Sequence, residues 1–200
     1  MIYRVFTSDE KIKNEIDILL QLFDRGLSVL HLRKKKWSID VYRKFLQSIP
    51  KNYHKKIIIH DHIVLLAEFD VGGFHLSTTH FNKIDKNELV KLRQRSFLWG
   101  VSTSAHSFKE IDPLFKNVDH LVVGPVFTSI SKTDYHPTFE WNVQHLSNAD
   151  RLIAIGGMSD QVIGHAHQLG FNQLGFLGYI WMNDDPVKQF DKLCLKMNDL

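Results

Sequence analysis

Basic and hydroxyl side chains gather in two short stretches of the sequence. The stretch "HLRKK" contains Arg33 and Lys35, and the stretch "GPVFTSISK" contains Ser129, Ser131 and Lys132. Arginine offers a planar fork of N–H donors, lysine a compact positive charge, and serine a short hydrogen bond to a phosphate oxygen. Either stretch alone is also typical of a solvated loop. Together they indicate binding of a phosphorylated ligand.

Other polar residues and glycines follow separate apolar runs. They are His60, Asp61, Ser77, His80, Ser102, Gly156, Gly157 and Gly178. Hydroxyl, carboxylate and imidazole groups can bind a ligand, and a glycine lets backbone amides approach it closely. Each also has a structural interpretation, since Asp61 could cap a helix and Gly-Gly is common at a strand-to-helix turn. The secondary structure around these residues therefore decides between the two interpretations.

Eight short runs rich in β-branched residues alternate with helical patterns. They cover residues 2–6, 28–33, 56–61, 73–77, 96–102, 120–124, 151–156 and 172–178. After the first run, Ile16, Leu19 and Phe23 recur at helical spacing, and Gly26 is typical of a helix end. Eight strands and intervening helices in 200 residues predict a single α/β domain over residues 1–200, a (β/α)8 TIM barrel. A doubly wound open sheet is the alternative.

The polar residues named above follow predicted strand ends, and barrel active sites are built there. Arg33 and Lys35 follow the second strand, and Ser129, Ser131 and Lys132 follow the sixth. The glycines follow the seventh and eighth strands, whose loops hold a phosphate in many barrels. The sequence thus predicts an anion-binding rim with two phosphate sites.

The composition argues against several classes of protein. The formal net charge is only +3, and the single cysteine, Cys194, rules out an internal disulfide. The first 20 residues lack a signal-peptide pattern, and no apolar run approaches the about 18 residues of a membrane helix. We therefore expect a cytoplasmic protein with no membrane partner. Basic runs at 33–36 and 51–56 lack an accompanying nucleic-acid-binding motif, so we also expect no nucleic-acid partner.

Five short motifs occur in order along the chain. They are "HLRKK", "HD" at His60 and Asp61, "GVS" at 100–102, "GPVFTSISK" and "AIGGM". The ordered set resembles the thiamine phosphate synthase and thiazole tautomerase family over residues 2–193. In the synthases the first motif begins with Gln where this chain has His31, and the second begins with Asn where it has His60.

The resemblance implies a reaction and roles for the matching residues. A synthase of this family joins hydroxymethylpyrimidine diphosphate to thiazole phosphate and releases pyrophosphate, with Mg²⁺ as cofactor. The resemblance assigns catalytic roles to Arg33, Lys35, Lys132 and Ser102, and it assigns metal binding to Asp61 and His80. Substrate binding falls on His31, His60, Ser129, Ser131, Gly156, Gly157, Leu177 and Gly178. The resemblance also suggests a homodimer.

Departures from the family pattern leave two alternatives open. His80 occupies the position of a second magnesium-binding Asp, and imidazole is a poor ligand for Mg²⁺. The tautomerase branch uses a His after the glycine of the sixth strand, where this chain has Pro125. The first alternative is a tautomerase that uses His31, His60, His80 or His106 for proton transfer. The second is a protein that binds phosphorylated ligands without catalysis.

Overall fold

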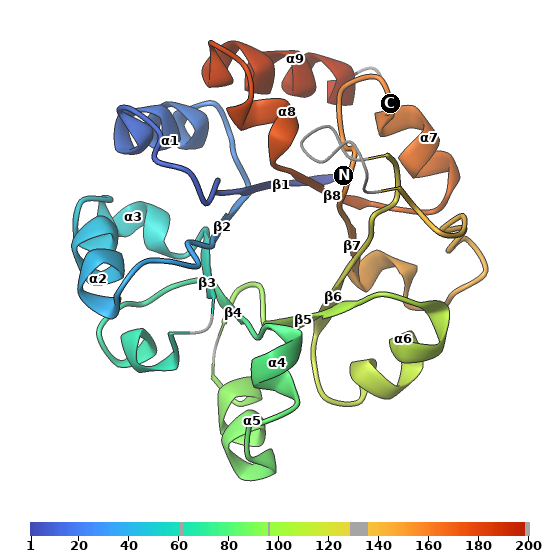
Figure 1. The fold of residues 1–200 in the computed structure, drawn as a ribbon, viewed down its shortest axis with the longest axis horizontal. Helices are drawn as coiled ribbons and strands as arrows, with labels where there is room; N and C mark the ends of the chain where they lie inside the picture. The colour runs from blue at the N-terminus through green and yellow to red at the C-terminus, as the bar shows by residue number, and fades with distance from the viewer. Residues whose placement is uncertain (61, 96, 129–135, 199–200) are drawn as a thin grey trace.

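The computed structural model describes residues 1–60, 62–95, 97–128 and 136–198. Its parallel strands form one closed barrel in sequence order, with β8 paired to β1 (Figure 1). The strands are β1 (Ile2–Phe6), β2 (Val29–Leu32), β3 (Ile57–His60), β4 (Gly73–His75), β5 (Val101–Ala105), β6 (His120–Val123), β7 (Leu152–Ala154) and β8 (Gln173–Phe176). The predicted (β/α)8 barrel is therefore confirmed, and the open sheet is wrong.

The helices surround the barrel (Figure 1). They are α1 (Glu15–Asp24), α2 (Ile39–Gln47), α3 (Lys51–His54), α4 (Thr78–Phe81), α5 (Lys86–Arg93), α6 (Phe108–Phe115), α7 (Ile163–Gln168), α8 (Gly178–Trp181) and α9 (Pro186–Asn198). Two 3₁₀-helices, η1 (Ile63–Ala67) and η2 (Ala149–Arg151), follow β3 and precede β7. Within the described ranges no helix is long and apolar enough to cross a membrane.

The fifth strand lies later in the chain than the sequence predicts. The apolar letters at 96–102 suggested a strand, but β5 covers Val101–Ala105, and Leu98 is 62% exposed in the loop before it. Gly100 has a φ of +66°, and Asp119 accepts a hydrogen bond from the backbone N–H of Val101 at 2.8 Å. These features start the strand at Val101. Ser102 therefore lies inside the barrel, where it is 1% exposed, and does not follow a strand end.

The two faces of the barrel wall differ in chemistry. Apolar side chains fill the layer between strands and helices, as on α1, where Leu19 and Phe23 are buried as predicted. The apolar cluster within the barrel consists only of Phe6, Val122 and Ile153, with Ile155 against it, among the described residues. The strands also bury several polar side chains, those of Arg4, His31, His60, His75, Ser102 and Gln173. The barrel thus encloses an unusually polar interior.

Candidate active site

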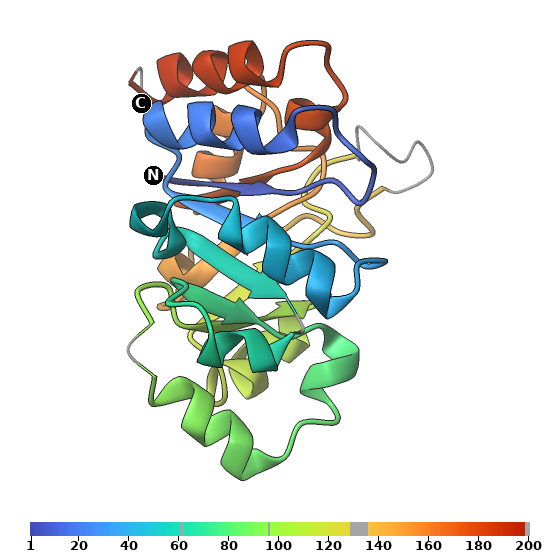
Figure 2. The ribbon, with the colours of Figure 1, turned by 90° about the vertical axis from the view of Figure 1, so that its left-hand side faces the viewer.

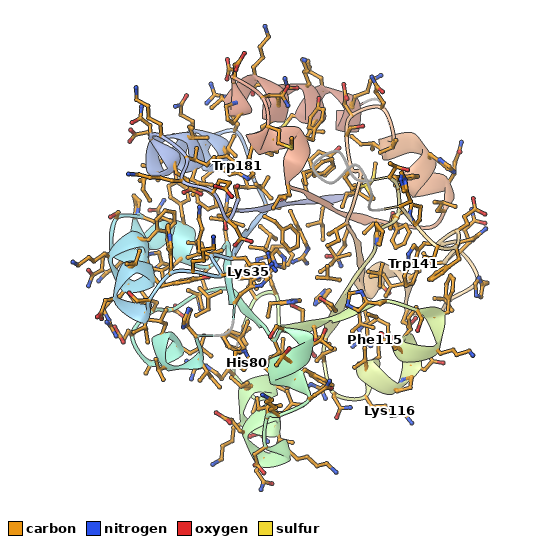
Figure 3. All side chains as sticks on the ribbon, viewed as in Figure 1. Lys35, His80, Phe115, Lys116, Trp141 and Trp181 are labelled. Atoms are coloured by element: carbon orange, nitrogen blue, oxygen red, sulfur yellow. The ribbon has the colours of Figure 1, made fainter. Side chains whose placement is uncertain are left out.

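One end of the barrel carries the residues that follow the strands. In the side view of Figure 2, β1 runs from the N-terminus at the left toward the right, so the carboxyl ends of the parallel strands face right, as does α4. In Figure 3, Lys35 lies beside the barrel opening and His80 lies on α4, farther from it. This end of the barrel is where the sequence predicts the site.

Arg33 and Lys35 share one acidic partner just past β2. The Asp9 carboxylate lies 3.3 Å from an Arg33 Nη1 nitrogen and 3.7 Å from the Lys35 Nζ nitrogen. Asp9 also accepts a hydrogen bond from the Lys35 backbone N–H at 3.0 Å. The Lys35 side chain is 60% exposed. The predicted cations are thus together at the barrel mouth, and Asp9 holds both.

Thr7 fixes the backbone that carries Arg33. Its Oγ1 accepts from the Arg33 N–H and donates to the Arg33 carbonyl oxygen, both at 2.8 Å. Since Thr7 follows β1 and Arg33 follows β2, this pair of hydrogen bonds joins the ends of two adjacent strands. The guanidinium therefore extends from a fixed point, which reduces the entropy lost when it binds an anion.

Lys34, between the two cations, points into the protein. Its Nζ lies 2.8 Å from Glu15 in a pair whose side chains are 1% and 7% exposed. The Lys34 backbone N–H donates to the Tyr42 hydroxyl at 2.7 Å. Burial raises the pKa of Glu15, and the hydrogen bond and charge of Lys34 oppose that rise. Lys34 therefore has a structural role. The basic side chains on either side of it, Arg33 and Lys35, point the other way and reach the barrel mouth.

Three histidines from adjacent strands meet inside the barrel. His31 Nδ1 lies 3.1 Å from His60 Nε2, and the rings of His60 and His75 stack at 4.3 Å. Phe6 stacks on His31 at 4.1 Å, with 16° between the planes. His75 Nδ1 lies 3.0 Å from Ser102 Oγ. The structure thus brings His31, His60 and Ser102 into one cluster, together with His75, which the sequence-based site omitted.

Burial and nearby charges keep His31 and His60 neutral. Burial lowers the pKa of His31 well below its ordinary value, and the Arg4 charge lowers it further. Burial has the same effect on the pKa of His60, reinforced by His75 and His31. Burial also lowers the pKa of Arg4 to about 9, which leaves its guanidinium protonated at neutral pH. The barrel interior therefore holds the neutral imidazoles of His31 and His60 beside the buried Arg4 cation.

His80 and Ser77 belong to the start of α4. Ser77 is the residue before the helix, and its Oγ accepts from the His80 N–H at 3.3 Å. His80 is exposed, and its Nδ1 lies 3.4 Å from the same Oγ. His80 is not part of the interior histidine cluster, so the structure separates it from His31 and His60.

The loops after β6 and β7 pack against each other. The N–H groups of Val126 and Phe127 donate to the carbonyl oxygens of Ile155 and Gly156 at 2.9 and 3.1 Å. Gly156 and Gly157 have φ angles of +88° and +67°. A Cβ atom on Gly156 would lie 2.7 Å from Pro125 Cα, and one on Gly157 would collide with the Thr128 carbonyl oxygen. Both positions therefore require glycine, because their φ angles are positive and the loop after β6 packs directly against their backbone.

The remaining predicted residues divide into two groups. Leu177 directly follows β8 and precedes α8, which begins at Gly178, so these two lie at the predicted strand end. Asp61, Ser129, Ser131 and Lys132 lie outside the described residues. Thr128 Oγ1 lies 3.3 Å from His136 Nδ1, which joins the described flanks on either side of 129–135.

The model of the family described as thiamine monophosphate synthase matches residues 2–175. The chain belongs to this family. Among curated relatives, the thiamine-phosphate synthase of Caldicellulosiruptor saccharolyticus is 23% identical over 190 residues, covering 90% of this chain and 83% of the relative. The family match agrees with the order of the motifs along the chain.

Solved structures of similar proteins carry the same barrel. The thiamine phosphate pyrophosphorylase of Bacteroides thetaiotaomicron superposes with a TM-score of 0.79 at 25% identity, covering 99% of this chain and 98% of that chain. The corresponding protein of Pyrococcus furiosus gives the same TM-score at 15% identity, with 99% and 96% coverage, and supports the fold alone.

Proposed function

We propose that this chain is a thiamine phosphate synthase of thiamine biosynthesis, a transferase that joins hydroxymethylpyrimidine diphosphate to thiazole phosphate and releases pyrophosphate. The observation that carries this proposal is the placement of Arg33 and Lys35 at the mouth of a barrel of the thiamine monophosphate synthase family. The interior beneath them presents the neutral imidazoles of His31 and His60 and the ring of Phe6, with the Arg4 guanidinium bonded to His31. A charged rim above an aromatic interior suits a substrate with a diphosphate attached to a flat ring.

Arg33 and Lys35 would bind the diphosphate and stabilise its departure. Negative charge accumulates on pyrophosphate as the bond to the pyrimidine methylene breaks, and fixed cations lower the energy of that charge. Lys132, Ser129 and Ser131 would complete the set of donors from the loop after β6. The described start of this loop is hydrogen-bonded to the end of β7. That attachment supports a role for the loop at the mouth.

The ring and the second phosphate have separate candidate residues. His31 and His60, beneath the rim, would contact the pyrimidine ring, and Ser102 would act through its contact with His75. Gly156, Gly157, Leu177 and Gly178 would offer backbone N–H groups to the thiazole phosphate. Gly156 and Gly157 have no side chain to cover their backbone, which supports their proposed role in binding the phosphate. We further propose that the protein acts in the cytoplasm and as a homodimer.

The described residues do not fit the magnesium site of the family. Mg²⁺ prefers oxygen ligands in octahedral geometry, and carboxylates are its usual protein ligands. The predicted second ligand position carries an imidazole on α4, at His80. Asp9, the acid nearest Arg33 and Lys35 among the described residues, is already paired with both. We therefore assign no catalytic step to Mg²⁺, and the reaction must be assayed with and without it.

A direct assay tests the proposed function. The purified protein is incubated with both substrates, with and without Mg²⁺, and thiamine phosphate is measured by chromatography. We expect product in at least one condition. Binding of both substrates without product would contradict the proposal and support a binding protein. Lys132→Ala should reduce the single-turnover rate about 100-fold or more, as loss of a preorganised charge does, while Lys188→Ala on α9 serves as the control.

A further inference from the structure

A line of hydrogen bonds crosses the barrel interior from Gln173 on β8 to His60 on β3. Gln173 Oε1 accepts from Arg4 Nε at 2.9 Å and also from Arg4 Nη2. Arg4 Nη1 lies 3.3 Å from His31 Nε2, and His31 Nδ1 lies 3.1 Å from His60 Nε2. All four residues are buried. The line ends at His60, the last residue of β3, on the side where the barrel opens.

The chemistry of Arg4 determines where the protons of this line lie. A guanidinium has only donors, so His31 Nε2 must accept from Arg4 with its lone pair. The single proton of neutral His31 is then on Nδ1, which donates to His60 Nε2. His60 consequently carries its own proton on Nδ1. One buried arginine thus fixes the tautomers of two histidines.

The same histidines could be considered as a metal site. One ligand atom from each of His31, His60 and His75 lies within 4.8 Å of the others. A metal-bound histidine, however, normally directs its second nitrogen as an N–H toward an acceptor such as a carboxylate. The second nitrogen of His31 instead faces the Arg4 guanidinium. A guanidinium can only donate to this nitrogen and cannot accept from it, so the cluster suits a hydrogen-bond line better than a metal site.

We propose that Arg4 is a positioning residue that makes His60 a hydrogen-bond donor, through its Nδ1–H, toward an acceptor atom on the ring of the substrate. The proposal rests on the proposed function for the identity of that ring, and a heteroaromatic ring nitrogen is the acceptor that fits. Phe6 stacks on His31 and His75 stacks on His60, so the surroundings of His60 are aromatic, as a flat ring ligand would require. On each of the two histidines that stand in place of Gln and Asn, one nitrogen is then the donor and the other the acceptor.

The tautomers can be measured in the ligand-free protein, independently of any turnover. Nitrogen NMR on protein labelled with ¹⁵N-histidine distinguishes an imidazole N–H from a bare ring nitrogen. We expect both His31 and His60 to carry their proton on Nδ1 at neutral pH. An Nε2–H tautomer on either residue would overturn the proposal. So would stoichiometric binding of Zn²⁺ that shifts the resonances of all three histidines.

Substitution of Arg4 tests whether this residue fixes the histidine tautomers. Arg4→Met should move His31 toward the Nε2–H form, which is the commoner tautomer of a free histidine side chain, whereas Arg4→Lys keeps a donor and should preserve the wild-type pattern. Arg95→Met is the matched control, because Arg95 donates to a backbone carbonyl outside the barrel. Unchanged tautomers in Arg4→Met would contradict the assignment. If Arg4→Met fails to fold, the wild-type measurement still decides.

A pair of ligands tests whether His60 donates a hydrogen bond to the substrate ring. Calorimetry compares hydroxymethylpyrimidine diphosphate with an analogue whose ring nitrogens are replaced by C–H. We expect the wild type to bind the analogue about 10- to 100-fold more weakly, because the donor is left unpaired. His60→Phe should bind the two compounds within about threefold of each other. Equal binding by the wild type would overturn the recognition step, and this result does not depend on whether the protein forms thiamine phosphate.

Discussion

The carboxylate of Asp9 lies between Arg33 and Lys35, at 3.3 and 3.7 Å, so a single acid neutralises part of the charge that the barrel mouth offers to an anion. An incoming diphosphate must compete with this carboxylate for the same N–H donors. Asp9 therefore has two opposing effects, because it orders the cations before binding and weakens their attraction for a ligand.

Asp9→Asn should increase the affinity for inorganic pyrophosphate about two- to fivefold, the range expected when a partly exposed ion pair is removed. The Asn oxygen can still accept from the Lys35 N–H, so the loop should keep its conformation. Isothermal titration calorimetry measures the effect, with Asp40→Asn, beside Arg43 on α2, as the control. A weaker affinity in Asp9→Asn would mean that ordering of the cations matters more than their charge.

Lys34 and Lys35 are neighbours in sequence with different predicted effects. Lys34→Met leaves Glu15 buried without its cation and should reduce the free energy of unfolding by about 3 to 5 kcal/mol. Lys35→Met should change stability by less than about 0.5 kcal/mol but weaken pyrophosphate binding. Urea denaturation and calorimetry on both variants separate the effects. Substantial recovery of stability in Lys34→Met/Glu15→Leu would confirm that the buried pair is responsible.

Stability should fall as the pH is lowered from about 6.5 to 5. His31, His60 and His120 have lowered pKa values in the folded protein, that of His120 about 4. In the unfolded chain they bind protons below about pH 6.5, so acid favours unfolding by about 1.4 kcal/mol per pH unit for each histidine.

His31→Gln tests this linkage, because it removes one titrating group while keeping an acceptor for Arg4. Urea denaturation at several pH values should show a slope smaller by about 1.4 kcal/mol per pH unit. His167→Gln, at an exposed position on α7, should keep the wild-type slope. The charges that act on His31 come from Arg4, His75 and His120. An unchanged slope in His31→Gln would show that the pKa of His31 is not lowered in the folded state.

Gly157→Ala should disturb the join between the loops after β6 and β7. The alanine would sit at a φ of +67° and its methyl group would meet the Thr128 carbonyl oxygen. We expect a loss of about 1 to 3 kcal/mol in the free energy of unfolding, with weaker binding of thiazole phosphate. Gly164→Ala is the control, since a Cβ there meets no atom within 4 Å. Normal stability and binding in Gly157→Ala would contradict the assigned role.

The barrel and its cationic rim follow from local patterns in the sequence. Apolar runs gave the strand order, and position after a strand end identified Arg33 and Lys35. The fifth strand was misplaced because Phe97, Leu98 and Trp99 resemble a strand, whereas the true strand is rich in hydroxyl residues and turns Ser102 toward the polar interior. Hydrophobicity is a weak guide where the inside of a barrel is itself polar.

Asp9, Thr7 and Arg4 were missed for a different reason. Each contacts a residue on or just after β2, and the pairing of β1 with β2 is a long-range contact that no single stretch displays. One signal was available: Arg4 interrupts the apolar run 2–6 at a position that alternates with the outward-facing Tyr3 and Val5. A charged residue on the inner face of a barrel strand requires a buried partner, which points to an interior polar cluster.

Arg4 also restricts how this sequence can evolve. If His31 changed to an apolar residue, the guanidinium would lose an acceptor and, among the described residues, keep Gln173 alone as its acceptor. If Arg4 changed first, both His31 and Gln173 would lose their buried donor. Either order passes through a destabilised intermediate, so positions 4, 31 and 173 should vary together among descendants of this chain. Joint variation of these three positions would therefore record selection on the barrel interior, which surface residues do not reflect.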